Sequence, residues 1–318
     1  MSIPHIILKN KYRLRYIAYF FGFIGFFRRV YLMRKFLQQR EIHTILAVDD
    51  YFSLITIFAS LGLNIKIVSS VRNNWNRLYK DTLIHLLPDF MYKKLLPYLL
   101  NRYVSSVHTV SKDLAQNLQE QYGIKNTHCI YNIFDFEKIQ TAAQISPSYS
   151  LPANYIINVG HFNQQKNQKE LLEIFKTLKE MALVEHLVFI GDGSNKALLQ
   201  DYCKSLNIEE SVHFLGKQKN PYPYIKQAQY YFATSLYEGL PAVLVESLFL
   251  QTPFLSYDCD YGPRELSQNI TDMNPQAFIN KAKVLLPNPM PEQNKRERDI
   301  MLKNFDTKYI IEQWIKIL

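Results

Sequence analysis

Two carboxylates separated by seven residues are the feature of this sequence that points most directly to chemistry. Glu238 and Glu246 enclose a Gly and a Pro in the stretch SLYEGLPAVLVE. Glu238 and Gly239 are typical of a loop, and Pro241 suits the first turn of a helix, where its missing N–H costs nothing. A loop that leads directly into a helix N-terminus presents backbone N–H groups, which predicts a site for an anion such as phosphate.

The same two carboxylates predict a polyol beside the anion. Leu240, Leu244 and Leu248 recur on one helical side, which would place Glu246 about two turns inside the helix. From there it could accept hydrogen bonds from a pair of sugar hydroxyls, while Glu238 faces a second polyol. The alternative is a surface loop and a core helix with a solvated Glu at each end, and this stretch alone leaves both open.

Length and composition restrict the class of protein. A chain of 318 residues is long enough for two domains, and 47% hydrophobic with 20% charged residues is typical of a globular protein. The three cysteines, Cys129, Cys203 and Cys259, form no C-x-x-C or Cys/His cluster, so neither a disulfide framework nor a zinc site is indicated. A reducing compartment fits this pattern, and we expect a cytoplasmic location.

The positive charge is concentrated in the first half of the chain. Residues 1–150 carry 19 Lys and Arg against 9 Asp and Glu, whereas residues 151–318 carry 18 against 19. The first 40 residues contain nine basic side chains and no acidic one, which predicts an anionic partner for this half. The nine are Lys9, Lys11, Arg13, Arg15, Arg28, Arg29, Arg34, Lys35 and Arg40. A nucleic acid is not expected, because no recognised binding module interleaves aromatic with basic residues here.

Residues 16–27, YIAYFFGFIGFF, form an uncharged run between Arg15 and Arg28. The run is shorter than the roughly 20 residues of a spanning helix, and no small-residue cleavage site of a signal peptide follows it. It predicts a core helix, a basic and aromatic segment on an anionic membrane surface, or a helix that is both. We therefore expect a peripheral protein on the inner face of the cytoplasmic membrane.

Alternating strands and helices predict two parallel-sheet domains in tandem. The predicted strands are 44–48, 65–71, 106–110, 128–131, 155–159, 186–190, 212–215, 230–233 and 254–256. We expect an N-terminal domain over 1–139, a linker over 140–152, a second domain over 153–306 and a C-terminal helix over 307–318. Polar and Gly residues follow many of these strands, where ligands of open α/β sheets bind.

Residues 155–268 resemble the donor domain of family-four retaining glycosyltransferases. The matching stretches are VGHFNQQKNQKELLEIF, FIGDGSNKALLQDYCKSLNIEESVHFLGKQKNPYPYIKQA, SLYEGLPAVLVESLFLQTPFLSYDCD and YGPREL. Their order and spacing match over the whole range, so the resemblance extends far beyond a lone motif. It implies the GT-B fold, in which two Rossmann-like domains face a cleft. It also implies a metal-independent transferase that uses a nucleotide sugar and no other cofactor.

The resemblance implies roles for individual residues. Glu238 and Glu246 match the family's E-x(7)-E pair; the first contacts the donor hexose and is the expected catalytic residue, and the second contacts the ribose hydroxyls. Lys166 matches the basic residue that holds the diphosphate. His161 stands where the family usually has Arg, and its charge near neutral pH depends on its surroundings. The other expected donor-binding residues are Gly160, Gly216, Gly239, Leu240 and Pro241.

The resemblance indicates the substrates only broadly. NPYPYI and DCDYGPREL resemble members that use uridine-diphosphate hexoses or N-acetylhexosamines. The expected acceptor is a glycan or lipid-linked glycan in lipopolysaccharide, capsule or similar surface-polysaccharide synthesis. Asp258-Cys259-Asp260 spells D-x-D, a metal site in a different transferase fold, but it matches a turn of this family, and we expect no metal there.

The first half departs from the family pattern. The family's opening strand, Gly-rich turn and helix have no counterpart here, so we expect an acceptor-side domain shortened at its N-terminus. IVSSVRNNW resembles the loop that faces the donor, which makes Arg72 and Asn73 acceptor-side candidates; a capped strand end on the surface is the alternative. A catalytically weak or inactive relative, acting as a partner or remnant, is the alternative function.

Overall fold

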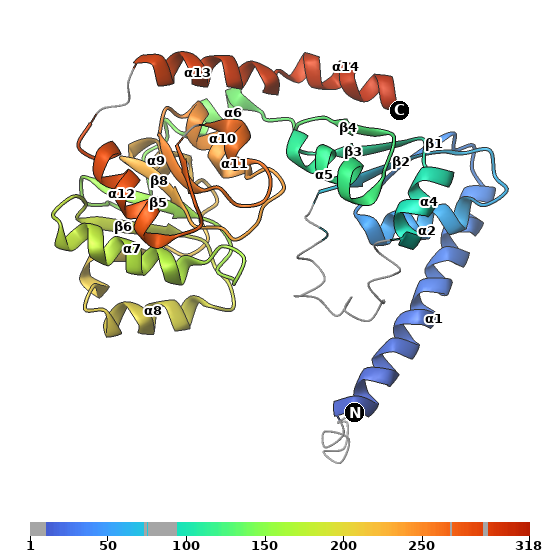
Figure 1. Cartoon of the computed structure of the whole chain (residues 1–318), viewed down its shortest axis with the longest axis horizontal. Helices are drawn as coiled ribbons and strands as arrows, with labels where there is room; N and C mark the ends of the chain where they lie inside the picture. Colours follow the sequence, from blue (N-terminus) through green and yellow to red (C-terminus); the bar gives the residue numbers. More distant parts are fainter. Residues whose placement is uncertain (1–10, 73–74, 76–93, 268, 289–291) are drawn as a thin grey trace. The chain divides into compact units, whose positions relative to one another are not determined.

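The chain forms two compact units, each with its own parallel sheet (Figure 1). The structure is a computed structural model that describes residues 11–72, 75, 94–267, 269–288 and 292–318. The first unit is Met1–Thr109, Ala115–Cys129 and Trp314–Leu318, and the second is Val110–Leu114 and Ile130–Gln313. The predicted fold class of two parallel-sheet α/β domains is confirmed.

The first unit is built on a four-stranded sheet in the order β1-β2-β3-β4. Its strands are β1 (Thr44–Val48), β2 (Lys66–Val71), β3 (Ser106–Thr109) and β4 (Thr127–Cys129). Its helices are α1 (Lys11–Gln38), α2 (Asp50–Ser60), α4 (Leu96–Tyr103) and α5 (Lys112–Tyr122), of which α5 begins within the second unit. α2 packs on β1 and β2 and also on α1. The uncharged run 16–27 lies within a longer helix, which begins at Lys11 and continues through the basic segment.

The second unit is built on a six-stranded sheet in the order β10-β9-β8-β5-β6-β7. Its strands are β5 (Tyr155–Val159), β6 (His186–Ile190), β7 (Val212–Phe214), β8 (Tyr230–Ala233), β9 (Phe254–Tyr257) and β10 (Ile270–Thr271). The order reverses at β5, which lies between β6 and β8. In open α/β sheets, ligands bind outside the carboxyl ends of the strands at such a reversal.

Helices cover both faces of the second sheet (Figure 1). The helices of this unit are α6 (Phe136–Ala142), α7 (Gln168–Glu180), α8 (Lys196–Ser205), α9 (Tyr222–Gln227), α10 (Ala242–Phe249), α11 (Pro263–Leu266), α12 (Pro275–Leu285) and α13 (Glu292–Leu302), and α14 (Thr307–Ile317) begins in it. α6 extends into the start of the predicted linker, and the Asp135 side chain caps its N-terminus by accepting from the Lys138 N–H at 3.0 Å. α14 ends in the first unit, where the Trp314 ring lies 4.4 Å from that of His108.

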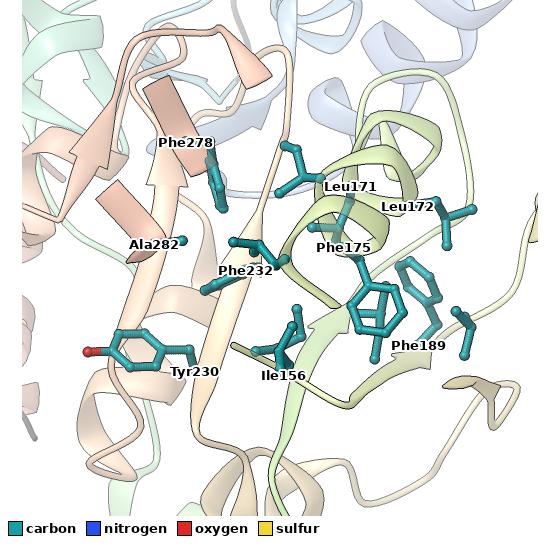
Figure 2. Close-up of a cluster of buried hydrophobic side chains, with 14 of the residues drawn as sticks. Ile156, Leu171, Leu172, Phe175, Phe189, Tyr230, Phe232, Phe278 and Ala282 are labelled. Carbon is teal, nitrogen blue, oxygen red and sulfur yellow. The ribbon is translucent and has the colours of Figure 1, made fainter. Parts of the chain in front are cut away.

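A hydrophobic cluster fixes the central strands of the second unit against α7 and α12 (Figure 2). The side chains labelled there come from β5, β6, β8, α7 and α12: Ile156, Phe189, Tyr230, Phe232, Leu171, Leu172, Phe175, Phe278 and Ala282. Phe175 and Phe232 are fully buried, and burying one such side chain contributes roughly 1.5–3 kcal/mol. This core fixes the position of the strands whose carboxyl ends form the site.

Candidate active site

The carboxyl ends of β5, β6 and β7 lie side by side, and each strand is followed within one or two residues by a glycine: Gly160, Gly191 and Gly216. The Gly160 N–H donates to the Ile190 carbonyl at 2.9 Å, and the Gly191 N–H donates to the Gly216 carbonyl at 3.0 Å. The sheet ladder thus continues one residue past β5 and β6 and reaches Gly216, two residues past β7. All three glycines are half-buried, and because they have no side chain a ligand can approach the backbone closely at these strand ends.

A glycine is required at position 191 because the loops after β5 and β6 pack closely against each other there. Its φ is +147°, and a Cβ atom at this position would lie 1.9 Å from the Gly160 carbonyl oxygen. The loop after β6 also accepts and donates across this contact: the Asp192 carbonyl accepts from the Phe162 N–H at 3.0 Å, and the Asn195 N–H donates to the Phe162 carbonyl at 3.2 Å. The GDG sequence after β6 therefore serves close packing against the loop after β5.

A cavity of about 600 Å³ opens at these strand ends. Its lining residues are Val159, Gly160, His161, Ile190, Gly191, Asp192, Gly193, Lys217, Gln218 and Pro221. Both predicted residues at the end of β5, Gly160 and His161, line it. Much of the lining is backbone and apolar surface, with three ionisable groups, His161, Asp192 and Lys217. Such a cavity suits a flat, partly apolar ligand that carries negative charge.

Two further lysines stand beside the glycines of this cavity. A Cβ on Gly160 would lie 3.5 Å from Cε of Lys166, so the lysine stem runs in van der Waals contact over Gly160. A Cβ on Gly216 would lie 4.0 Å from Nζ of Lys196. Lys196 and Lys217 do not stand out in the sequence, since single lysines close to a Gly-containing turn give no pattern that distinguishes them from surface residues.

The loop after β5 is bonded to the loop after β8. The Leu236 N–H donates to the Gln165 carbonyl at 2.8 Å, and the Gln165 side-chain amide donates to the Tyr237 carbonyl at 2.9 Å. The Thr234 hydroxyl donates to the Asn167 carbonyl at 3.0 Å. These hydrogen bonds hold together two loops whose bonded residues are up to 72 positions apart in the chain. The contact positions the side chains of both loops.

Lys166 and Glu238 form an ion pair across these two loops. Nζ of Lys166 lies 2.6 Å from Oε1 of Glu238, and Glu238 is only 9% exposed. The Glu238 N–H donates to the Asp260 carbonyl at 3.1 Å, which fixes the backbone. The structure thus brings the predicted diphosphate residue and the predicted hexose residue into direct contact.

The second carboxylate, Glu246, projects from α10. Pro241 follows Gly239 and Leu240 directly and is the N-cap of this eight-residue helix, one position before the first turn in which the sequence predicts it. Glu246 is the fifth helical residue, a little over one turn from the start rather than the predicted two, because the helix begins at Ala242. Leu240 is buried, as are Leu244 and Leu248.

Glu246 accepts a hydrogen bond from a residue that the sequence analysis did not single out. The Tyr222 hydroxyl donates to Oε1 of Glu246 at 3.4 Å. Burial raises the pKa of Glu246 to about 7, and the hydrogen bond from Tyr222 acts against that rise. The sequence signal for Tyr222 was the NPYPYI stretch, which was interpreted only as a donor preference.

The D-x-D sequence is engaged in other contacts. Oδ1 of Asp258 accepts from Nε of Arg264 at 2.8 Å, Cys259 is buried, and the Asp260 carbonyl accepts from Glu238. Across the described residues, no group of three or more His, Cys, Asp or Glu is arranged to hold a metal ion.

The acceptor-side candidates belong to the first unit. Arg72 is exposed and directly follows β2, and Asn73 lies outside the described residues. Two acidic residues that the sequence analysis did not identify, Asp49 and Asp50, follow the neighbouring strand β1. Asp49 has a φ of +72°, and burial raises the pKa of Asp50 to about 7. Because β1 and β2 are parallel neighbours, these residues and Arg72 share one edge of the sheet.

Within the second unit, Lys217 lines the cavity, and further cations and carboxylates contact residues that line it or adjoin its lining. Lys166, Lys196 and Lys217 can stabilise negative charge on a bound ligand, and the first turn of α10 adds backbone N–H groups. Glu238 and Glu246 can each accept hydrogen bonds from hydroxyl groups. These parts suit an anion that carries polyols on both sides.

The comparisons with known proteins agree with this chemistry. Residues 143–298 match the family model of glycosyl transferases group 1. An uncharacterized glycosyltransferase of Methanocaldococcus jannaschii is 27% identical over 293 residues, which cover 79% of this chain and 71% of the relative. A Campylobacter jejuni relative, N-acetylgalactosamine-N,N'-diacetylbacillosaminyl-diphospho-undecaprenol 4-alpha-N-acetylgalactosaminyltransferase, is 32% identical over 201 residues, which cover 63% of this chain and half of the relative.

Solved structures agree on the fold. Anabaena Alr3699/HepE in complex with UDP superposes with a TM-score of 0.74 at 17% identity, over 90% of this chain and 80% of that protein. At this identity the likeness concerns the fold, which for both units is that of the GT-B transferases.

Proposed function

Because this chain belongs to the group 1 glycosyltransferases of GT-B fold, we propose that it moves a hexose or N-acetylhexosamine from a uridine-diphosphate sugar to a glycan or lipid-linked acceptor. The reaction would retain the configuration at the anomeric carbon. The observation that carries the proposal is the Lys166–Glu238 pair beside a cavity at the carboxyl ends of β5, β6 and β7. It supplies a cation for a diphosphate and a carboxylate for the attached sugar at one place.

In this proposal, the nucleoside diphosphate occupies the cavity. The base and ribose would lie against the residues after β7, with the ribose hydroxyls toward Glu246. The diphosphate would lie near Gly160 and His161, where Lys166 passes, and at the start of α10. UDP bound to the Anabaena protein, whose fold is the same, supports this choice of donor nucleotide.

The chemistry follows from the charges. The bond between the anomeric carbon and the diphosphate oxygen breaks, and the leaving diphosphate gains negative charge that Lys166 and the helix N–H groups stabilise. The acceptor oxygen bonds to the anomeric carbon on the same face, and its proton passes to the leaving phosphate. Glu238 favours the positive charge that develops on the sugar. No protein group is therefore assigned as a general base.

The proposal is tested with purified protein in the presence of a chelator. UDP-glucose, UDP-galactose, UDP-N-acetylglucosamine and UDP-N-acetylgalactosamine are supplied in turn, and released UDP is measured with and without a membrane lipid extract. We expect one of them to give UDP release that increases with the extract and falls in Glu238→Gln. UDP binding without transfer from any donor would instead support the weak or inactive relative, and absence of UDP binding would overturn the donor assignment.

The acceptor is proposed to belong to surface-glycan synthesis. The name of the Campylobacter relative describes a glycan linked to diphospho-undecaprenol, which is a membrane lipid. Mass spectrometry of surface glycans from a strain lacking this protein would identify the missing sugar. Unchanged glycans in a strain that normally expresses the protein would contradict this role.

We infer that α1 brings the protein to the inner face of an anionic cytoplasmic membrane. None of the helices among the described residues is long and apolar enough to cross a bilayer. The exposed side of α1 carries large apolar side chains together with cations: Ile24, Phe27, Arg28, Tyr31, Leu32, Lys35 and Phe36. Apolar and basic residues on one exposed surface are typical of helices that lie in a membrane interface.

The opposite side of α1 is used for packing. Phe26 lies 5.9 Å from the Phe58 ring and 6.1 Å from the Tyr51 ring of α2. Nη1 of Arg34 donates to the Ala59 and Leu61 carbonyls at 3.0 and 2.7 Å, which caps the end of α2. One side of α1 thus packs against α2 and the other side is exposed. Arg34, one of the nine cations of the first 40 residues, has a structural role.

A further inference from the structure

We propose that Tyr222 is a positioning residue for Glu246, and that its hydroxyl orients this carboxylate and keeps it charged for a vicinal diol of the nucleotide. The inference rests on the proposed function, in which Glu246 contacts the ribose. It adds a residue that acts through Glu246 without itself being assigned to the ligand. Nothing in the E-x(7)-E spacing identifies Tyr222, which comes from a different helix.

Tyr222 is anchored on the N-terminal side of its backbone through Asn220. Oδ1 of Asn220 accepts from the Tyr222 N–H at 3.3 Å, and the Asn220 side-chain amide donates to the Ala142 carbonyl at 2.8 Å. Pro221 between them has a restricted φ. The Tyr222 ring is therefore presented toward Glu246 by a segment with little freedom of its own.

The same segment forms a wall of the cavity. Lys217, Gln218 and Pro221 line it, and the Gln218 side-chain amide donates to the Leu215 carbonyl at 2.6 Å. A ligand in the cavity would contact the segment that leads to Tyr222, and the backbone between Gln218 and Tyr222 would then connect the ligand to the Tyr222–Glu246 hydrogen bond.

Glu246 depends on Tyr222 for its charge. Among the described residues no cation forms an ion pair with Glu246. The titratable groups that face it are the hydroxyls of Tyr222 from α9 and Tyr231 from β8, and the Tyr231 hydroxyl donates to the Val159 carbonyl at 2.8 Å. Burial disfavours the carboxylate, and the Tyr222 hydrogen bond is the interaction that favours it. A protonated Glu246 would accept one hydrogen bond fewer from a diol.

The test measures UDP affinity by calorimetry between pH 5.5 and 8.5 in wild type and Tyr222→Phe. Wild-type affinity should fall as the pH drops through the pKa of Glu246. In Tyr222→Phe that pKa rises, so the midpoint of the fall should move to higher pH. Affinity at pH 7 should drop about two- to tenfold, the range for one hydrogen bond, and recover toward pH 8.5.

Tyr224→Phe is the matched control, because Tyr224 lies in the same helix and its hydroxyl accepts from the Tyr149 N–H at 3.1 Å. It should leave the midpoint unchanged. 2′,3′-Dideoxy-UDP should bind more weakly and without the Tyr222-dependent shift. An identical midpoint in wild type and Tyr222→Phe would overturn this inference while UDP binding itself upholds the donor site. Absence of UDP binding by wild type would overturn the donor site and the inference together.

Discussion

Lys166 and Glu238 face each other at 2.6 Å from two loops that are 72 positions apart in the chain. The pair joins the residue proposed to hold the diphosphate to the residue proposed to contact the hexose. A phosphate oxygen that enters beside Lys166 would share its ammonium with Glu238. Donor binding and the electrostatic environment of Glu238 are therefore coupled.

Lys166→Met should weaken UDP binding by about 1.5–3 kcal/mol, the range for a hydrogen bond to a charged group. Methionine retains much of the apolar stem that lies over Gly160 and removes the ammonium. Calorimetry in chelator measures the effect. Equal affinity of wild type and variant would remove Lys166 from the diphosphate site.

The same variant should reveal the coupling in protein stability. Lys166→Met leaves Glu238 shielded from solvent without its partner, so the free energy of unfolding should fall by about 1–3 kcal/mol. Adding Glu238→Gln should restore part of the loss. Urea denaturation of both single variants and the double variant measures this, and strictly additive effects would show that the ion pair contributes no coupling energy.

Glu238→Gln should affect turnover far more than nucleotide affinity. The amide keeps the size of the side chain but loses the charge that favours a cationic sugar in the transition state. We expect a lower kcat with nearly unchanged UDP binding, measured with saturating donor. Wild-type turnover in this variant would show that Glu238 is a structural residue of the loop.

Glu246 should make the protein less stable as the pH rises. Its pKa is raised by burial from 4.5 to about 7, so the folded state binds more protons than the unfolded state between these values. The contribution of Glu246 to the free energy of unfolding is therefore most favourable below pH 4.5, and this contribution is lost as the pH rises through 7. At 1.36 kcal/mol per pKa unit, the loss is about 3 kcal/mol at most.

Glu246→Gln removes this titration. The variant should be more stable than wild type at pH 8 and similar at pH 4.5, although it loses affinity for UDP. Urea denaturation at the two pH values measures the difference. Parallel pH dependences of the two proteins would show that Glu246 is charged in the folded state throughout this range.

The sequence could predict the layout of both sheets because alternation of apolar strands and amphipathic helices is a local signal. The strands β5 to β9 lie within a few residues of their predicted positions. After residue 256 the prediction contained only the C-terminal helix. β10 has two residues, and α13, with its many charged residues, shows little apolar periodicity. Such elements are defined by tertiary contacts, which the sequence pattern does not contain.

The candidate site could be predicted only in part, for a related reason. Gly160, Lys166, Glu238 and Glu246 carry motif spacing; the structure places the first three on neighbouring loops and Glu246 on α10. Their partners do not: the Lys166–Glu238 ion pair depends on how the loops after β5 and β8 are bonded, and Tyr222 reaches Glu246 from another helix. Spacing along the sequence does not predict a contact between residues that come together only because of the order of the strands in the sheet.

Gly191→Ala should collapse the cavity. The new Cβ would meet the Gly160 carbonyl oxygen at 1.9 Å, so the loops after β5 and β6 must separate. Gly62→Ala is the control, because Gly62 has a φ of +75° and open space around its Cβ position. The control should lose only about 1–2 kcal/mol for the left-handed backbone. Gly191→Ala should lose more, together with UDP binding, and similar losses for the two variants would contradict the close approach.

The membrane proposal predicts that the exposed cations of α1 contribute to vesicle binding and that the packed cation, Arg34, contributes less. Arg28 and Lys35 are exposed, whereas Arg34 caps α2. An anionic leaflet attracts each nearby Lys or Arg by about 1 kcal/mol, so Arg28→Gln with Lys35→Gln should weaken vesicle binding by about 30-fold. Co-sedimentation with vesicles of phosphatidylglycerol and phosphatidylcholine measures this, with pure phosphatidylcholine as the neutral reference.

Arg34→Gln is the matched control, with one cation removed from the same helix. It should lower the free energy of unfolding, because two carbonyls at the end of α2 lose their donor, and should reduce vesicle binding less than the double variant does. Binding should also weaken as salt rises from 0.05 to 0.5 M, since the interaction is screened over about 10 Å at 0.1 M. Binding that ignores salt and lipid charge would show that the aromatic side chains alone hold the helix at the bilayer. Absence of binding to every vesicle would assign the exposed side of α1 to a contact other than a membrane.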